Sequence, residues 1–271
     1  MSRLLIKPNR NQALWHNISK ESADWCYVGF QVLILKAGEE FSFPALSDTE
    51  RCFTILAGKA DVILTEQSAP IEYRNIGERE SVFEDKSPFA VYVPPKLSVN
   101  IKALSDNLEI GISSAPAEGK FPCRLIRPEE MKRSVRGKGS NTRYICDILP
   151  ETDKSAENLL VVEVITPNGN TSSYPPHKHD QATENETYLE ETYYHSITPP
   201  QGFAFQRVYT DDRSLDEVMA VENHDVVLVP KGYHPCATIH GYDLYYLNTM
   251  AGGARRWQFY NAPEHEWLLK I

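Results

Sequence analysis

The chain consists mainly of short β-rich runs that turn-forming residues close, and it has few long runs with helical periodicity. Gly, Pro, Asn or Asp bounds each run, which is typical of strands in a sandwich or barrel. The clearest runs are residues 28–38, 52–65, 87–95, 158–169, 192–197, 203–210, 225–232 and 243–250. We expect a short helix or turn over residues 214–225. The pattern predicts an all-β fold.

A weak internal repeat relates the two halves of the chain. VLILKAGEEFSFP, ERCFTILAG and AVYVPPKLSVNI in the first half parallel VVEVITPNGNTSSYPPHKHD, EETYYHSI and VVLVPKGYHPCATI in the second. In each half an acidic residue, Glu50 or Glu191, opens a strand-like run. Residues 129–141 read as a helical turn and a Gly/Ser-rich connector. We therefore predict one domain over residues 1–135 and a second over residues 136–271.

Composition narrows the range of partners. The net charge of -9 argues against nucleic acid, because phosphate binding needs a basic surface. No segment approaches the roughly 18 apolar residues of a membrane helix, and the N-terminus has no stretch that reads as a signal peptide. The five cysteines are scattered without paired spacing, so we expect reduced thiols and no disulfide framework. These features predict a cytoplasmic protein without a membrane partner.

Six of the eight histidines fall between residues 177 and 240. His177 and His179 are two residues apart, so in a strand both imidazoles face the same way. His234, in VPKGYHP, could supply a third imidazole where a later strand begins. With one carboxylate they would form a set suited to Zn²⁺, Mn²⁺ or Fe²⁺ that leaves coordination positions open. The alternative is that paired histidines at a strand end are ordinary polar surface.

This order of residues resembles the cupin family of small β-barrels, in which H-x-H and Glu are followed by a second motif with the last His. The second motif here is one residue shorter than the usual P-x-G-x-x-H. The family spacing points to Glu184, but that residue lies in a polar segment expected to be a loop. Glu191 opens a strand and is the more rigid ligand, so we favour it. The first half offers Ser98 where the second has His234, which predicts one metal site per chain, in the C-terminal barrel.

A closer resemblance follows from TSSYPPHKHD, LEETYYHSITPPQGFAFQRVYTDDRSLDE, VLVPKGYHP and YYLNTMAGGARRWQF. These strings are similar to the 5-deoxy-glucuronate isomerase family, a bicupin group related to the uronate isomerase of pectin breakdown. The resemblance implies conversion of 5-deoxy-D-glucuronate to 5-dehydro-2-deoxy-D-gluconate in myo-inositol catabolism. It also implies two cupin-type barrels in one chain, a sugar-acid substrate, and one divalent metal per chain, with zinc preferred over manganese or iron.

Further residues are assigned by the chemistry that such a reaction needs. A base must lie within reach of the transferred proton, and His195, on the same strand face as Glu191, is the first candidate. Tyr246 is the second; either could instead be a core residue. The substrate carboxylate calls for a guanidinium group, for which Arg143 and Arg207 are candidates. Arg207 could equally lie outside the barrel in a salt bridge.

Other functions fit parts of the same pattern. A cupin dioxygenase could use iron and O₂ at these ligands, although the polar residues around H-x-H favour a sugar. A non-enzymatic sugar-binding cupin is a third possibility, but no stretch has the helical periodicity of an attached DNA-binding module. A homo-oligomer is plausible for exposed strands. Residues 180–190 are a candidate lid over the substrate.

Overall fold

The computed structural model describes residues 2–66 and 69–270, and these are almost all in strands, turns and loops. The helices described are short 3₁₀ segments: Pro128–Glu130, Gly139–Asn141 and Pro263–Lys270. Among the described residues none of them has the length and apolarity needed to span a bilayer. The prediction of an all-β fold is therefore confirmed.

The chain forms two compact units that are discontinuous in sequence. The first comprises Met1–Pro8, Arg133–Asp147 and Val162–Ile271, and the second Asn9–Lys132 and Ile148–Val161. The boundary expected between residues 135 and 136 falls inside strand β12 (Lys132–Arg136). Each unit combines a large sheet with a four-stranded sheet.

The second unit encloses a core made mostly of aliphatic side chains, with Phe43 and Phe53 among them. In its six-stranded sheet the order is β11 (Arg124–Ile126), β8 (Ala90–Val93), β5 (Thr49–Ala57), β10 (Leu108–Pro116), β3 (Gly29–Leu35) and β2 (Leu14–Ile18). Its four-stranded sheet has the order β4 (Glu40–Phe43), β9 (Ser98–Ala103), β6 (Ala60–Thr65) and β7 (Ile71–Ile76). Alternate residues of both sheets, such as Ile55, Val62 and Ile101, are buried in one cluster. The strand period of two places these side chains on facing surfaces.

The first unit holds the histidine-rich segments. Its larger sheet has the order β1 (Leu5–Ile6), β20 (Val226–Val229), β17 (Leu189–Thr198), β22 (Asp243–Gly252), β14 (Leu160–Thr166), β13 (Arg143–Leu149) and β12. The four-stranded sheet has the order β15 (Thr171–Ser172), β21 (Cys236–Thr238), β18 (Phe203–Tyr209) and β19 (Asp216–Glu222). A separate pair joins β16 (His177–Lys178) to β23 (Tyr260–Asn261). The interior strand β17 pairs antiparallel with both β20 and β22.

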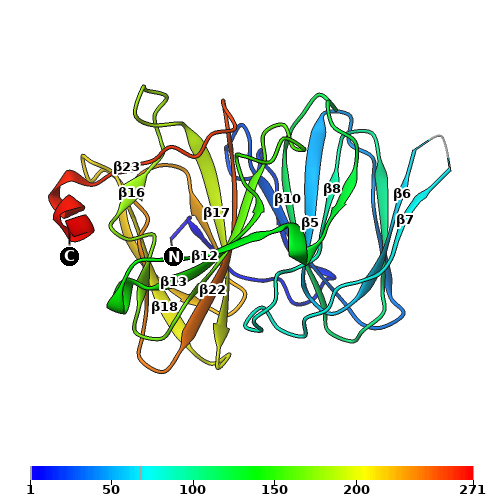
Figure 1. Cartoon of the computed structure of the whole chain (residues 1–271), viewed down its shortest axis with the longest axis horizontal. Helices are drawn as coiled ribbons and strands as arrows, with labels where there is room; N and C mark the ends of the chain where they lie inside the picture. The colour runs from blue at the N-terminus through cyan, green and yellow to red at the C-terminus, as the bar shows by residue number, and fades with distance from the viewer. Residues whose placement is uncertain (1, 67–68, 271) are drawn as a thin grey trace. The chain divides into compact units, whose positions relative to one another are not determined.

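The N-terminal strand β1 belongs to this first unit. Figure 1 shows the blue N-terminal segment among the green, yellow and orange strands of the unit. Leu5 and Ile6 pair antiparallel with Val227 and Val226 of β20, and Leu4 is buried. The first residues of the chain thus complete a sheet made otherwise of residues beyond 131.

Residues 214–225, expected to hold a short helix or turn, form no helix, and their turn is confined to residues 223–224. Residues 216–222 form strand β19, which pairs with β18 along its whole length. Met219 and Val221 are buried, while their neighbours Ala220 and Glu222 are exposed. This alternation has the period of a strand, and the strand pairing outweighs the helical preference of the acidic and alanine residues.

Candidate metal centre

Strand β17 places a carboxylate inside the first unit. Glu191 is 2% exposed and lies on the same strand face as Tyr193 and His195, since alternate residues of a strand point the same way. On its two sides Glu191 is in register with Val229 of β20 and Met250 of β22. A residue in the middle of a sheet has little freedom, so the carboxylate is held rigidly.

Two buried imidazoles face this carboxylate. The Nε2 atoms of His179 and His234 each lie 3.1 Å from Oε2 of Glu191. His234 comes directly after a turn at Gly232, whose φ is +88°. A Cβ there would lie 2.4 Å from the carbonyl oxygen of Tyr209, so only glycine fits. The turn aims His234 at Glu191.

The other nitrogens of these rings fix the tautomers. Nδ1 of His179 lies 3.0 Å from the carbonyl oxygen of Leu189, and Nδ1 of His234 lies 2.9 Å from that of Gly232. A carbonyl can only accept, so each Nδ1 donates and each neutral ring has its lone pair on Nε2. Two lone pairs then face one carboxylate oxygen, which is repulsive unless a cation or protons lie between them. This donor set suits a divalent metal ion.

His177 lies beside the three. Its ring centroid is 4.9 Å from that of His234 and 6.4 Å from that of His179. It comes from β16, in register with Asn261 of β23, and it is half-buried. The ligand atoms of His179, Glu191 and His234 all lie within 4.8 Å of one another, and His177 borders this triad rather than being part of it.

The charges of the cluster are coupled. Burial alone would raise the pKa of Glu191, but His234 and His179 lower it to about 2. Burial would lower the pKa of His179, but its bond to Glu191 raises it above the ordinary value. For His177, burial and then the two neighbouring imidazoles lower the pKa well below 6.5. The site therefore has an ionised carboxylate, and protons compete with any metal for His179.

A cavity opens onto Glu191 and His177. Several of its residues were not singled out from the sequence: Arg136, Asn248, Trp257, Phe259, Asn261 and Leu269. The guanidinium carbon of Arg136 lies 5.3 Å from the Trp257 ring centroid, and Phe259 packs 4.6 Å from the His177 ring. The only sequence signal for this side of the cavity was the aromatic run that contains Trp257 and Phe259, after the long strand β22.

The two candidate arginines occupy different places. Arg143 is half-buried and lines the cavity, with Nη1 donating to the carbonyl oxygen of Asn141 at 3.0 Å. Burial and then Arg136 lower its pKa, although Tyr246 opposes this. Arg207 lies outside the residues that line the cavity. It binds both carboxylate oxygens of Asp216, at 2.7 and 2.6 Å.

The candidate acid–base residues lie at different depths. Tyr246 lines the cavity beside Tyr193, whose hydroxyl lies 2.9 Å from that of Ser173. Burial raises the pKa of Tyr246, so its hydroxyl is protonated at neutral pH. His195 is not among the lining residues; its Nε2 donates to Gln206 Oε1 at 2.9 Å. Burial lowers the pKa of His195 to about 4, so the ring is neutral.

The two candidate glutamates are likewise separated. Glu184 is exposed in the loop between β16 and β17, and its carbonyl accepts from the side chain of Gln258 at 3.1 Å. It is not in the cluster that holds Glu191. The base of this loop is pinned, since the buried carboxylate of Glu186 accepts from the backbone N–H groups of Asp180 and Gln181.

In the second unit, Glu50 of β5 has a different role. Its two carboxylate oxygens accept from the backbone N–H groups of Glu157, Asn158 and Leu159 at 2.7–2.8 Å. Tyr92 also donates to it, at 2.7 Å. Three of the four donors to this buried carboxylate thus belong to one loop, which Glu50 holds in place.

Comparisons with known proteins agree on one family. The profile of the KduI/IolB family matches residues 4–268. A 5-deoxy-glucuronate isomerase of Geobacillus thermodenitrificans (strain NG80-2) is 50% identical, over 100% of this chain and 97% of the relative. One of Bacillus subtilis (strain 168) is 47% identical over 100% of both chains. The crystal structure of an IolB-like protein from Salmonella typhimurium LT2 superposes with a TM-score of 0.94, at 50% identity, covering 99% of this chain and 100% of that one.

A more distant structure shares the fold alone. The oxalate decarboxylase of Lactobacillus farciminis, solved as a formate complex, superposes with a TM-score of 0.65 at 12% identity. The match covers 100% of this chain and 91% of that one.

Proposed function

Because the chain belongs to the KduI/IolB family, we propose that it converts 5-deoxy-D-glucuronate to 5-dehydro-2-deoxy-D-gluconate with the help of a divalent metal ion. Relatives that match it along its full length, at 47% and 50% identity, are isomerases by name, and this chain is accordingly an isomerase. The observation that carries the proposed mechanism is the convergence of His179, Glu191 and His234 beside a cavity lined by arginines.

We assign the metal to His179, Glu191 and His234, with the neighbouring His177, whose ring lies 4.9 Å from that of His234, as the fourth ligand. Zinc is the first choice, and manganese or iron are alternatives. Imidazole and carboxylate donors accept all three ions. The lone pairs that face Glu191 support a cation at this point. A bound divalent ion would supply positive charge that stabilises the negative charge developing on the substrate oxygens.

The substrate carboxylate would be bound by guanidinium groups. Arg143 and Arg136 both line the cavity, and no described carboxylate forms an ion pair with Arg143. Arg207 is already satisfied by Asp216, which makes it the weaker candidate. A half-buried guanidinium strongly favours an anionic partner, because burial costs free energy unless the charge is paired.

Moving the carbonyl from C1 to C2 requires a proton to leave C2 and return at C1. Tyr246, protonated and facing the cavity, would donate a hydrogen bond to the substrate oxygen where charge develops. His195 lies one ring deeper, with its centroid 6.0 Å from that of Tyr246 and 5.9 Å from that of Tyr193. We propose His195 as the base: its ring is neutral, Nε2 donates to Gln206, and Nδ1, unpaired among the described residues, would hold the proton between its removal from C2 and its return at C1.

We propose that the chain contains two cupin-type barrels, residues 1–135 and 136–271, and that they have different roles. Support for two barrels comes from the division of the chain into two compact units, although each unit is discontinuous in sequence and takes segments from both sides of residue 135. We place the metal in the C-terminal barrel. In the other barrel Glu50 is occupied by backbone donors, and the core is apolar.

The test is an assay of the purified protein with 5-deoxy-D-glucuronate, following the keto product by NMR in air and under nitrogen. We expect product only with metal bound, at the same rate in both atmospheres. Glu191→Gln should lose metal and activity by more than the roughly 10- to 100-fold that outer partners of a ligand cost. Glu184→Gln is the matched control and should resemble the wild type.

Each other outcome refutes a defined part of the proposal. Turnover after complete metal removal would eliminate the metal mechanism. Turnover that requires O₂ would favour a dioxygenase. Metal bound without turnover would mean that the substrate is wrong, and a loss of metal in Glu184→Gln but not in Glu191→Gln would exchange the two glutamates.

A further inference from the structure

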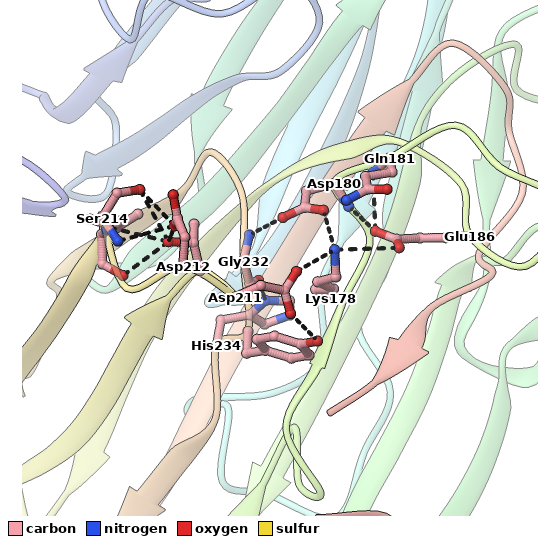
Figure 2. Close-up of polar contacts among 12 residues, drawn as sticks. Lys178, Asp180, Gln181, Glu186, Asp211, Asp212, Ser214, Gly232 and His234 are labelled. Carbon is pink, nitrogen blue, oxygen red and sulfur yellow. Dashed lines mark hydrogen bonds and ion pairs between the residues drawn. The ribbon is translucent and has the colours of Figure 1, made fainter. Parts of the chain in front are cut away.

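Lys178 stands between the two histidines of the H-x-H motif and points away from the candidate metal. Its side chain is only 4% exposed, and a buried ammonium group is costly unless it is paired. Figure 2 shows Nζ of Lys178 surrounded by carboxylates: Asp180 at 2.9 Å, Asp211 at 3.1 Å and Glu186 at 3.6 Å. We call these four residues the Lys178 cluster.

Each carboxylate of the Lys178 cluster holds a second group. Asp180 Oδ2 accepts from the backbone N–H of Gly232 at 2.8 Å. Asp211 Oδ1 accepts from the hydroxyl of Tyr233 at 2.8 Å. Glu186 accepts from the backbone N–H of Gln181 at 3.0 Å, at the base of the loop that leads to β17. Three stretches distant in sequence therefore meet at one ammonium group.

Two of the groups bound by these carboxylates, in Gly232 and Tyr233, lie next to the candidate metal ligand His234. Gly232 and Tyr233 immediately precede His234, and the carbonyl oxygen of Gly232 accepts from Nδ1 of His234 at 2.9 Å. Lys178 itself is flanked by His177 and His179. The contacts of one side chain thus fix the position of the H-x-H strand relative to the turn that carries His234.

We propose that Lys178 is a positioning residue, which holds the histidines of the two motifs at metal-binding distance through Asp180 and Asp211. This inference rests on the proposed metal-dependent function. Without the ammonium group, three carboxylates would face one another, two of them with side chains at most 11% exposed. Their repulsion would separate the strand of His177 and His179 from the turn of His234.

The test compares Lys178→Met with Lys7→Met. Lys7 is a suitable control because it too is paired with two carboxylates in the same unit, Glu222 and the buried Asp225, both at 2.8 Å, and contacts no candidate ligand. The probe is Co²⁺, added to metal-free protein. Its visible absorption reports coordination geometry, and competition with a chromophoric chelator gives the dissociation constant. Urea unfolding of the metal-free proteins measures stability separately.

We expect Lys178→Met to weaken Co²⁺ binding about 10- to 100-fold and to change the absorption spectrum, as outer partners of ligands do. Lys7→Met should lose stability while its Co²⁺ affinity and spectrum stay those of the wild type. If Lys178→Met lost only stability, with affinity and spectrum unchanged, the positioning role would be refuted. If the wild type bound no Co²⁺, the proposed metal function would fail first, and this inference with it.

Asp211→Ala provides a second variant in case Lys178→Met does not fold. The Asp211 side chain is 61% exposed, so its loss leaves no buried gap, but it removes the contacts with both Lys178 and Tyr233. We expect a smaller loss of Co²⁺ affinity, roughly 3- to 10-fold. An affinity equal to that of the wild type would contradict the proposed link between Asp211 and His234.

Discussion

At the scale of single residues, the environment of an arginine decides what it can bind. Asp216 already holds both ends of the Arg207 guanidinium, whereas Arg143 faces the cavity. We predict that Arg143→Met raises KM for the sugar acid roughly 10- to 100-fold, the loss expected for a charge-assisted bond. Arg207→Met should leave KM within about 2-fold of the wild type. Steady-state kinetics of both variants checks this, and the reverse order would return Arg207 to the site.

His195 should make stability depend on pH. Its pKa is about 4 in the folded chain, against an ordinary value of 6.5. Between these values the unfolded chain binds a proton that the folded chain does not, so stability falls as the pH falls from 6.5 to 4. The slope from this group is at most about 1.4 kcal/mol per pH unit.

The measurement is urea unfolding of the metal-free protein at several pH values between 7 and 4.5. His195→Gln keeps a donor for Gln206 but cannot take up a proton, so its unfolding free energy should fall less steeply than that of the wild type. If the unfolding free energies of the wild type and the variant fell equally steeply with pH, His195 would either be charged in the folded chain or contribute nothing to the pH dependence of stability.

The sequence could predict the ligands better than the cavity wall. Glu191 lies in strand β17 and His234 follows a glycine turn, so periodicity and turn chemistry predict where these two side chains point. For His177 and His179 the H-x-H spacing was the only sequence signal. The structure brings His179, Glu191 and His234 together and places His177 beside them, while their role as ligands stays a prediction. Arg136 and Trp257 reach the cavity from segments about 120 residues apart, and no local pattern encodes such a meeting.

At the scale of strands, equivalent positions of the repeat have diverged in use. Glu50 and Glu191 both lie near the start of a long interior strand, β5 or β17. Glu191 faces imidazoles, whereas Glu50 accepts three backbone N–H groups and the hydroxyl of Tyr92. One acidic position thus serves a candidate metal in one unit and a loop in the other.

Glu50→Gln should therefore lower the free energy of unfolding by about 3 kcal/mol, because the new amide N–H₂ would face donors instead of accepting from them. Tyr92→Phe removes one of the four bonds and should cost about 1 kcal/mol. Neither variant should change Co²⁺ affinity. Urea unfolding and Co²⁺ titration check both statements, and weaker Co²⁺ binding in Glu50→Gln would contradict the separation of roles.

Most strands could be predicted, because turn residues bound them and their apolar residues alternate. Strand β19 was missed, since its acidic residues and alanine resemble a helix when the pairing with β18 is unknown. Two-residue strands such as β16 are too short for any periodicity to be read. Their existence depends on a partner distant in sequence.

At the scale of the whole molecule, the N-terminal strand β1 joins a sheet that is otherwise made of residues beyond 131. Leu4 is buried, its carbonyl oxygen accepts from the backbone N–H of Leu228 at 2.8 Å, and Lys7 pairs with the buried Asp225. The sequence predicts one domain over residues 1–135. It gives no sign of a two-residue strand whose partners lie 222 and 220 positions away, Val227 for Leu5 and Val226 for Ile6.

Deletion of residues 2–8 should destabilise the unit that holds the candidate metal. Loss of Leu4 burial alone costs roughly 1.5–3 kcal/mol, and the free edge of β20 becomes exposed. Lys7→Met removes the ion pairs of Lys7 but keeps strand β1, and it should lower the free energy of unfolding by about 1 kcal/mol. Comparing it with the deletion therefore separates the contribution of the ion pairs from that of the strand. Thermal unfolding with and without Co²⁺ measures both; an unchanged midpoint in the deletion variant would show that β1 contributes little.

The pairing of β1 with β20 also sets an order of events during synthesis. At about 5–20 residues per second, Leu5 leaves the ribosome on the order of ten to forty seconds before Val226. Throughout this interval the N-terminal segment has no partner strand, while the second unit can already fold. The unit that holds the candidate metal is therefore completed later than the second unit, by a segment made long before its partner strand, and a bulky fusion before residue 5 would hinder only that late pairing.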